Sequence, residues 1–153
     1  MITNKNIKTK LVNFSGLNAI YTQVLDFPIG VDYSFRKMEI NLPKSSKRKF
    51  FGAISHKGNE VIYQACASLL KENEELNSGY EKVFIPGGKY VLYTLENWSK
   101  NTHLVKEIFE ELQHKYLIDP NRPQLEHYRN KKELEIMLPI KNREEQLSFL
   151  FDV

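Results

Sequence analysis

The sequence carries one pattern twice, about seventy residues apart. In the second copy, the apolar run Val83–Ile85 breaks at a Pro-Gly-Gly sequence and resumes as Lys89–Leu95. Aromatic and β-branched residues dominate this stretch, which predicts a strand with a kink near its start. In the first copy, Ala19–Thr22 aligns with Val91–Thr94. Self-similarity at a fixed spacing predicts two modules of like structure.

A helix is predicted after the strand of each copy. In the second copy, apolar residues recur at helical spacing at Leu104, Ile108, Leu112 and Tyr116, with charged residues on the other side. In the first copy, the weaker polar and apolar alternation of Val31–Leu42 predicts the equivalent helix. The apolar face of each helix is expected to pack on a sheet.

Two short alternating runs close each copy and predict antiparallel hairpins. They are Phe51–His56 with Glu60–Ser68 in the first copy, and Gln124–Arg129 with Glu133–Ile140 in the second. The unit is therefore strand, helix, strand, strand, and the fold class is α+β. We expect one domain over residues 1–153, with module one at about 8–70, module two at about 80–141 and a C-terminal tail at 142–153.

Composition favours a soluble globular protein of the cytoplasm. The chain has 153 residues and 18.0 kDa, with 41% hydrophobic and 27% charged residues, and its longest apolar run is too short to cross a bilayer. We therefore expect no membrane partner. The first residues lack the apolar stretch of a secretion signal, and the single Cys66 cannot form an internal disulfide. Cys66 is predicted to be a small buried hydrophobe rather than a nucleophile.

The net charge of +3 does not by itself indicate nucleic-acid binding. Four cations cluster between the first helix and its hairpin: Lys44, Lys47, Arg48 and Lys49. No helix-turn-helix pattern, zinc spacing or aromatic platform accompanies them, so they are predicted to form a solvated loop, and direct DNA binding is not expected.

Strong signatures of enzymes and metal sites are absent from the sequence. The four histidines, His56, His103, His114 and His127, lack metal-ligand spacing. The glycines at 87 and 88 lack the further glycines and the Lys-Ser/Thr of a phosphate loop. We therefore predict no catalytic residue, no metal and no cofactor.

Three stretches together carry a family resemblance: IPGGKY at 85–90, PQLEHY at 123–128 and EIMLPI at 135–140. They resemble the GyrI-like small-molecule-binding family, which includes effector-binding domains of AraC-type and MerR-type multidrug regulators and stand-alone proteins. The resemblance extends from about Lys8 to Lys141. It implies antiparallel sheets with pseudo-two-fold symmetry, helices on one face and a ligand cleft on the other. The chain begins close to its first strand, which favours the stand-alone form.

The family resemblance also implies a buried carboxylate that recognises lipophilic aromatic cations, and the matching position is Glu126. Because strand side chains alternate, we assign Leu125 and the apolar set of the last strand to the face under the helix. Glu126, Tyr128, Glu135 and Met137 then line the opposite face. Met137 departs from the aromatic residue that the family often has at this place.

In the first copy, the equivalent positions are Gly52 and Ile54, followed by Val61 and Tyr63, so one wall of the cleft is predicted to be acidic and the other apolar. Trp98 is predicted either to reach the cleft rim or to anchor the start of the helix. The predicted ligand-binding residues are Glu126, Tyr128, Glu135, Met137, Tyr63, Ile54, Val61 and Trp98. In the alternative interpretation, these glutamates lie on a solvated sheet face.

Three functions remain open at this point. The resemblance favours a stand-alone multidrug-type protein that senses or sequesters lipophilic, cationic aromatic molecules. An alternative is a hydrolase of electrophilic, cyclopropane-bearing toxins. The third is an inhibitor or adaptor of the replication or topoisomerase machinery, because the tail Gln146–Phe151 resembles short peptides that dock on the bacterial sliding clamp. Packing of this tail against the domain is the competing interpretation.

Overall fold

The computed structural model describes residues 8–142. Its strands are β1 (Lys10–Phe14), β2 (Leu17–Val24), β3 (Phe50–Lys57), β4 (Glu60–Ser68), β5 (Glu81–Ile85), β6 (Gly88–Glu96), β7 (Gln124–Tyr128) and β8 (Glu133–Pro139). Its α-helices are α1 (Val31–Asn41), α2 (Glu75–Ser78) and α3 (His103–Lys115). The predicted docking motif Gln146–Phe151 lies outside the described residues, so it stays a prediction.

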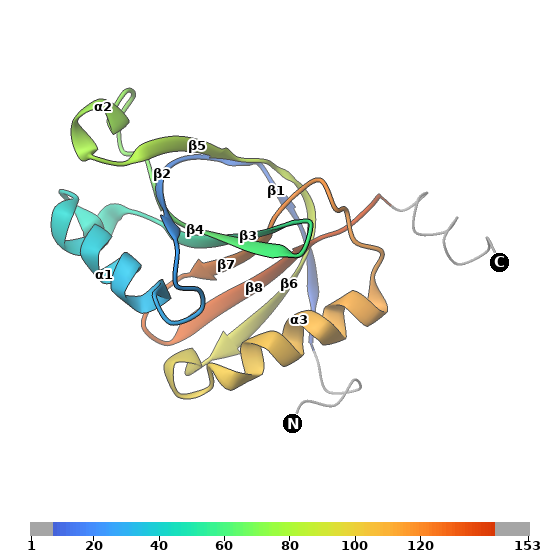
Figure 1. The fold of residues 1–153 in the computed structure, drawn as a ribbon. Coiled ribbons are helices and arrows are strands. Elements are labelled where there is room, and N and C mark those ends of the chain that lie inside the picture. Colours follow the sequence, from blue (N-terminus) through green and yellow to red (C-terminus); the bar gives the residue numbers. More distant parts are fainter. Residues whose placement is uncertain (1–7, 143–153) are drawn as a thin grey trace.

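The eight strands form one antiparallel sheet in the order β1-β6-β8-β7-β3-β4-β2-β5 (Figure 1). If each strand is exchanged for its counterpart in the other module, the same order results, read from the opposite edge of the sheet. The first strand of each module pairs with the second strand of the other, as β1 with β6 and β5 with β2. The modules therefore share one sheet, and the predicted α+β class with two related modules is confirmed.

The ladders place the internal repeat in register. A shift of 71 residues carries Ala19 to Tyr90 and Ser68 to Pro139, and these are paired residues in equivalent ladders. The match of Ala19 with Val91 that the sequence suggests is therefore one residue too far along the chain. A slip of one residue exchanges the two faces of a strand, so the ladder and not the alignment assigns the faces.

The single kinked strand predicted around residues 86–88 is two strands, β5 and β6, which pair with different neighbours. Each module breaks at a glycine in the same place, Gly16 and Gly87, and the two breaks lie against each other. A Cβ on Gly16 would lie 2.7 Å from the ring of Phe84, and one on Gly87 would clash with the carbonyl oxygen of Phe14. Glycine is required because the two backbones approach so closely.

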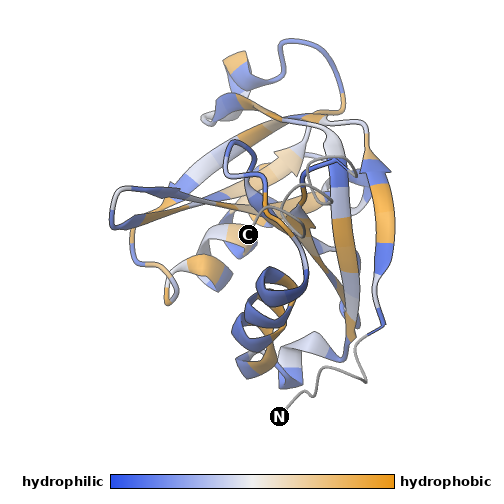
Figure 2. Cartoon of the chain, turned by 90° about the vertical axis from the view of Figure 1, so that its right-hand side faces the viewer, coloured by the Kyte–Doolittle hydropathy of each residue, from blue (hydrophilic) through white to orange (hydrophobic). Residues whose placement is uncertain are grey.

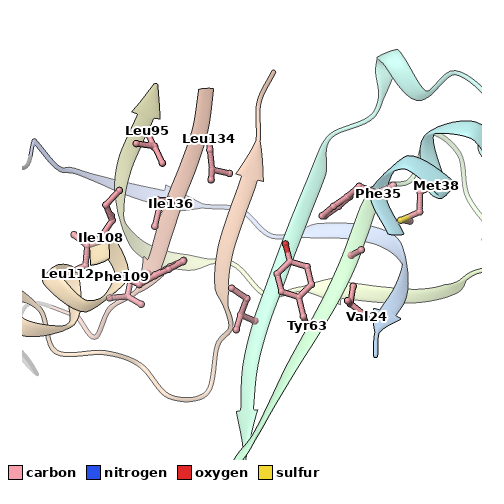
Figure 3. Packing of buried hydrophobic residues seen from close by; sticks show 14 of the residues in the cluster. Val24, Phe35, Met38, Tyr63, Leu95, Ile108, Phe109, Leu112, Leu134 and Ile136 are labelled. Atoms are coloured by element: carbon pink, nitrogen blue, oxygen red, sulfur yellow. The ribbon is translucent and has the colours of Figure 1, made fainter. Parts of the chain in front are cut away.

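Helices α1 and α3 pack on one side of the sheet, over a buried cluster that we call the helix-side core. Its members include Phe35 and Met38 from α1, and Ile108 and Leu112 from α3 (Figure 3). The predicted apolar face of α3 is thereby confirmed. Hydrophilic residues cover much of the remaining surface of α3, while hydrophobic residues recur along the strands (Figure 2).

The other side of the sheet is also buried, in what we call the opposite-face core. Its buried members are Ala19, Phe51, Ala53, Cys66, Ile85, Tyr90, Leu92, Leu125 and Met137. Leu125 belongs here because it pairs with Met137, whereas Glu126 pairs with Ile136 of the helix-side core. The predicted face of Leu125 is therefore wrong. Where both faces of a strand are buried, the alternation of apolar and polar residues no longer distinguishes them.

Two smaller predictions have different outcomes. Cys66 is fully buried, as expected, and burial raises the pKa of its thiol to about 12, which makes it unreactive. In the basic loop, Lys44, Lys47 and Lys49 are exposed, but Arg48 is only 7% exposed and pairs with Glu74. The prediction of a solvated loop is therefore wrong for Arg48.

None of the helices in residues 8–142 is long and apolar enough to cross a membrane.

Candidate functional site

The candidate site lies where the two modules meet, at the pairing of β3 with β7. The 71-residue shift carries Ala65, the partner of Gly52, to Ile136, the partner of Glu126. Gly52 and Glu126 are therefore equivalent positions, and they also pair with each other. The pseudo-two-fold axis passes between them, so one module supplies a carboxylate at the axis and the other supplies no side chain.

Two tyrosines direct their hydroxyl groups at this carboxylate. Tyr63 Oη donates to Glu126 Oε1 at 2.6 Å, and Tyr128 Oη donates to the same oxygen at 2.9 Å. The two hydroxyl oxygens lie 3.2 Å apart. Each phenol has a single proton, and both protons are used in these hydrogen bonds to the carboxylate. Glu126 is thus held by one tyrosine from each module.

Burial controls the ionisation of this cluster. Glu126 is 8% exposed, and the loss of solvation raises the pKa of its carboxyl group, which the two tyrosine hydroxyls counteract. Burial also raises the pKa of Tyr63 and Tyr128, and the charge of Glu126 raises them further. None of the salt bridges among residues 8–142 involves Glu126. The site therefore holds a desolvated carboxylate that has no cationic partner among the described residues.

Aromatic rings cover the tyrosine pair. Phe27, from the loop between β2 and α1, stacks on Tyr63 with ring centroids 5.2 Å apart and an interplanar angle of 22°. Phe35 of α1 packs against Tyr128 at 4.9 Å, and Trp98 packs edge-on against the same ring at 5.1 Å. Figure 3 shows Tyr63 between the side chains of α1 and those of α3. The two tyrosines that hold the carboxylate are therefore themselves covered by aromatic rings.

Gly52 makes room for the cluster. A Cβ at this position would clash with the hydroxyl group of Tyr63 and lie 3.1 Å from Glu126 Oε1. Its backbone φ is not in the left-handed region, so the requirement for glycine is the space and not the conformation. Because Gly52 of module one has no side chain, Tyr63 fits beside it and reaches Glu126 of module two.

Several predicted site residues are brought together as expected, although on the side of the helices. Glu126, Tyr128 and Tyr63 form the hydrogen-bonded cluster, and Ile54 is buried in the same core beside Tyr63. Trp98 contacts Tyr128, and its Nε1 donates to the carbonyl oxygen of Asn130 at 3.0 Å. The prediction that these residues lie opposite the helices is wrong, because Phe35 of α1 contacts Tyr128 directly.

The other predicted residues lie elsewhere. Val61 is on β4 two residues from Tyr63, next to the hairpin turn, and is 42% exposed. Glu135 and Met137 are on the opposite face. There, Glu135 Oε1 lies 2.7 Å from Nδ1 of His127, whose ring stacks on Phe51 at 4.3 Å. Burial lowers the pKa of His127 in spite of this carboxylate. Glu135 is therefore not a neighbour of Glu126 in the site.

Sequence reasoning missed Phe27, Phe35 and the steric role of Gly52. Phe35 could have been found, since it lies on the apolar side of the predicted helix. Phe27 had no signal, because a loop residue between a strand and a helix belongs to no periodic pattern.

Neither of two hollows on the surface exposes the carboxylate. One is lined by Glu96, Asn97 and residues 130–133, and the other by residues 8–10 and 92–94. Neither lining includes Glu126, Tyr63 or Tyr128. No group of three or more His, Cys, Asp or Glu side chains in the described part of the chain could hold a metal ion.

This geometry agrees with a family match. The model of the integron-associated effector binding protein family, Cass2, matches residues 32–140. The chain belongs to this family. Cass2 is a GyrI-like family, so the resemblance drawn from the sequence is confirmed. Membership supports the binding of small molecules as the general function.

Solved structures with the same fold accompany the Cass2 match. An integron cassette protein from the mobile metagenome of Vibrio cholerae is 17% identical with a TM-score of 0.61, over 87% of this chain and 95% of that one. SAV2435 bound to tetraphenylphosphonium is 10% identical with a TM-score of 0.66, over 91% and 97%. A hydrolase from Listeria innocua is 11% identical with a TM-score of 0.56, over 88% and 92%. At these identities the likeness shows the fold alone. No curated protein matches the sequence.

Proposed function

We propose that this protein binds lipophilic aromatic cations, with Glu126 as the group that recognises the charge. The observation that carries the proposal is the buried carboxylate held by Tyr63 and Tyr128 without a cationic partner among the described residues. Buried carboxylates are normally paired, because an isolated charge in an apolar environment is costly. A bound cation would supply the missing charge.

The surroundings favour a delocalised cation over a compact one. Phe27, Phe35 and Trp98 offer ring faces and edges around the tyrosine pair. Aromatic faces attract cations, and apolar walls remove water from the ligand's own rings. A delocalised cation is weakly hydrated and loses little on entry, whereas an ammonium ion must give up a tightly held shell of water. SAV2435, which has the same fold, was solved with a ligand of this kind, tetraphenylphosphonium.

The binding experiment compares two glutamates of the same hairpin. Glu126→Gln keeps the shape and removes the charge, and we expect it to weaken tetraphenylphosphonium binding by about 1 to 3 kcal/mol. Glu135→Gln is the matched control, since Glu135 lies on the opposite face beside His127. It should change the affinity by less than about 0.5 kcal/mol. Equal losses in both variants, or none in Glu126→Gln, would contradict the assignment.

Hydrolysis is the second candidate function. Glu126 retains its proton more readily than an exposed glutamate and lies beside two hydroxyl groups, which is an arrangement able to protonate an electrophile. Incubating the protein with cyclopropane-bearing electrophiles and following their masses distinguishes the two functions. Product that appears with the parent and not with Glu126→Gln would favour the hydrolase. Intact ligand at equal amounts in both would favour binding alone.

A further inference from the structure

The proposed site is closed, so a ligand must move a side chain to reach it. Glu126 is 8% exposed, and the rings that cover its tyrosine partners are Phe27, Phe35 and Trp98. A closed apolar pocket of this kind opens in a minor conformation that the ligand then stabilises. The ring that moves is expected to be the one whose displacement exposes the least buried surface and breaks the fewest hydrogen bonds.

Phe35 and Trp98 are each fastened in place. Phe35 is in the middle of α1, is 9% exposed and belongs to the helix-side core with Met38. Trp98 is tied by the hydrogen bond from its Nε1 to the carbonyl oxygen of Asn130, at the turn between β7 and β8. Moving either ring would break the packing of a helix or a hydrogen bond across the module.

Among the residues that the structure describes, Phe27 makes a single ring contact, its stacking on Tyr63. Its side chain is 40% exposed, and the two other apolar residues of the turn, Leu25 and Ile29, are 86% and 89% exposed. The hydrogen bonds of the turn run within it and into α1: Gly30 N donates to Asp26 O, Val31 N to Pro28 O, and Ser34 Oγ to Gly30 O. None of these hydrogen bonds involves Phe27, so its ring can rotate away from Tyr63 about its own side-chain bonds without breaking them.

We propose that Phe27 is the gate of the binding site: its ring covers the face of Tyr63 in the free protein, and an aromatic ring of the ligand takes its place there. This inference rests on the proposed function, since it concerns access to the same carboxylate. The nearly parallel contact of Phe27 with Tyr63 marks a surface on which one aromatic ring replaces another.

The face of Tyr63 under the gate selects among cations. A ligand that carries at least one aromatic ring recovers the stacking that is lost when Phe27 leaves Tyr63, whereas an aliphatic cation of the same charge does not. The uncovered ring of Tyr63 therefore favours aryl cations over alkyl cations independently of the charge of Glu126.

The test measures the rate of entry. Trp98 is the only tryptophan of the chain and touches Tyr128, so its fluorescence reports occupation of the site without a label. Stopped-flow mixing with tetraphenylphosphonium is carried out on the parent, Phe27→Ala, Phe27→Leu and Ile29→Ala. Ile29→Ala is the matched control, because it shortens an apolar side chain of the same turn that lacks the ring contact with Tyr63.

In the parent, the observed rate should level off with ligand concentration, because opening must precede entry. In Phe27→Ala it should rise linearly and be at least about tenfold faster at high concentration, with a severalfold gain in affinity. Phe27→Leu should be intermediate, and Ile29→Ala should follow the parent. Tetraethylammonium should bind the parent more weakly than tetraphenylphosphonium does, and Phe27→Ala should raise the affinity for both cations, because both must displace the same ring in the parent.

Two results separate the gate from the proposed function. Equal rates in the parent and in Phe27→Ala, or a loss of affinity in Phe27→Ala, would overturn the gate, while binding that still depends on Glu126 would preserve the proposed function. If tetraphenylphosphonium binds neither the parent nor Phe27→Ala, the proposed function and the gate are overturned together.

Discussion

The two modules are alike at the arginine that precedes their third strand and differ at the axis between them. Arg48 and Arg122 lie two residues before β3 and β7, at equivalent positions of the repeat. Arg48 donates to the carbonyl oxygens of Pro43 and Ser68, and Arg122 donates to those of Lys89 and Ile140. Each arginine therefore ties the start of its third strand to neighbouring segments of backbone.

At the axis, the equivalent positions differ in chemistry. Gly52 faces Glu126, Ile54 corresponds to Tyr128, and Tyr63 corresponds to Leu134. Two glutamates at the axis would place like charges on directly paired residues, which would destabilise the sheet and raise the pKa of one of them. The repeat therefore supplies a symmetric scaffold, and the loss of symmetry at the axis leaves a single carboxylate there.

The largest effect is expected at the arginine that precedes β3, where Glu74 accepts from Arg48 at 2.5 and 2.8 Å. Glu74→Gln should lower the free energy of unfolding by about 3 to 5 kcal/mol, because it leaves a buried guanidinium without its countercharge. Asp119→Asn removes the ion pair of the corresponding Arg122, in which the side chains of Arg122 and Asp119 are 14% and 24% exposed, and should cost less. Denaturant titration of both variants compares the two arginine pairs, and an equal cost would contradict the difference in burial.

The Glu74 pair also predicts a pH dependence. Hydrogen bonds from Arg48 lower the pKa of Glu74 to about 2 from an ordinary value of 4.5. Because the folded-state pKa is depressed, the stabilisation is present above 4.5 and is lost as the pH falls through about 2. The difference in stability between the parent and Glu74→Gln should therefore narrow over this range.

Module two is expected to depend on the packing of α3. Ile108 is fully buried in the helix-side core, so Ile108→Ala should cost about 2 to 4 kcal/mol through lost burial and the cavity left behind. Lys106→Ala, on the exposed side of the same helix, should change the stability by less than about 0.5 kcal/mol. Similar midpoints for both variants in urea would show that the face of α3 has been assigned wrongly.

At the axis, Gly52→Ala introduces a methyl group where Tyr63 now places its hydroxyl. We expect a cost of about 1 to 3 kcal/mol from overpacking, together with weaker tetraphenylphosphonium binding, because Tyr63 must leave Glu126. Chemical denaturation and fluorescence titration measure the two effects. Unchanged values of both would mean that the small residue at the axis does not shape the site.

The smallest effect has the opposite sign. Burial raises the pKa of Glu126 above its ordinary value of 4.5, so its contribution to stability is present below that pH and is lost as the pH rises through the folded-state pKa. Glu126→Gln has no charge to desolvate and should be more stable than the parent at pH 8 by about 0.5 to 2 kcal/mol. Thermal unfolding from pH 4 to pH 8 measures this gain, and a constant difference would contradict the raised pKa.

The sequence predicted the secondary-structure elements more accurately than the face of the sheet on which each strand residue lies. Repeated spacing located the helices and hairpins within a few residues, because periodicity and turn residues act locally. The first strand of each module, β1 or β5, pairs with a strand of the other module. Such pairing joins residues far apart in the chain, so no local sequence pattern predicts it. Glu126 was found through the family resemblance, and its partner Tyr63 through the repeat.

The errors at the site have one physical origin. Leu125 was assigned to the helices because it is apolar, yet the curled sheet buries apolar residues on both sides, and Leu125 packs with Met137. Glu135 was consequently placed beside Glu126. The pairing register of β7 with β8 shows which face each residue occupies, and this register cannot be read from the sequence. The covering ring of Phe27 belongs to tertiary structure alone, since nothing in its loop is periodic.

We propose that the carboxylate at the asymmetric axis recognises positive charge, and one pair of ligands tests this proposal directly. Tetraphenylphosphonium and tetraphenylborate have nearly the same shape and opposite charges, so the ratio of their dissociation constants isolates the charge from the apolar contacts. The parent should bind the cation at least about tenfold more tightly than the anion, and in Glu126→Gln the two affinities should converge to within about threefold. Equal affinities in the parent, or a preference that survives in Glu126→Gln, would contradict the account.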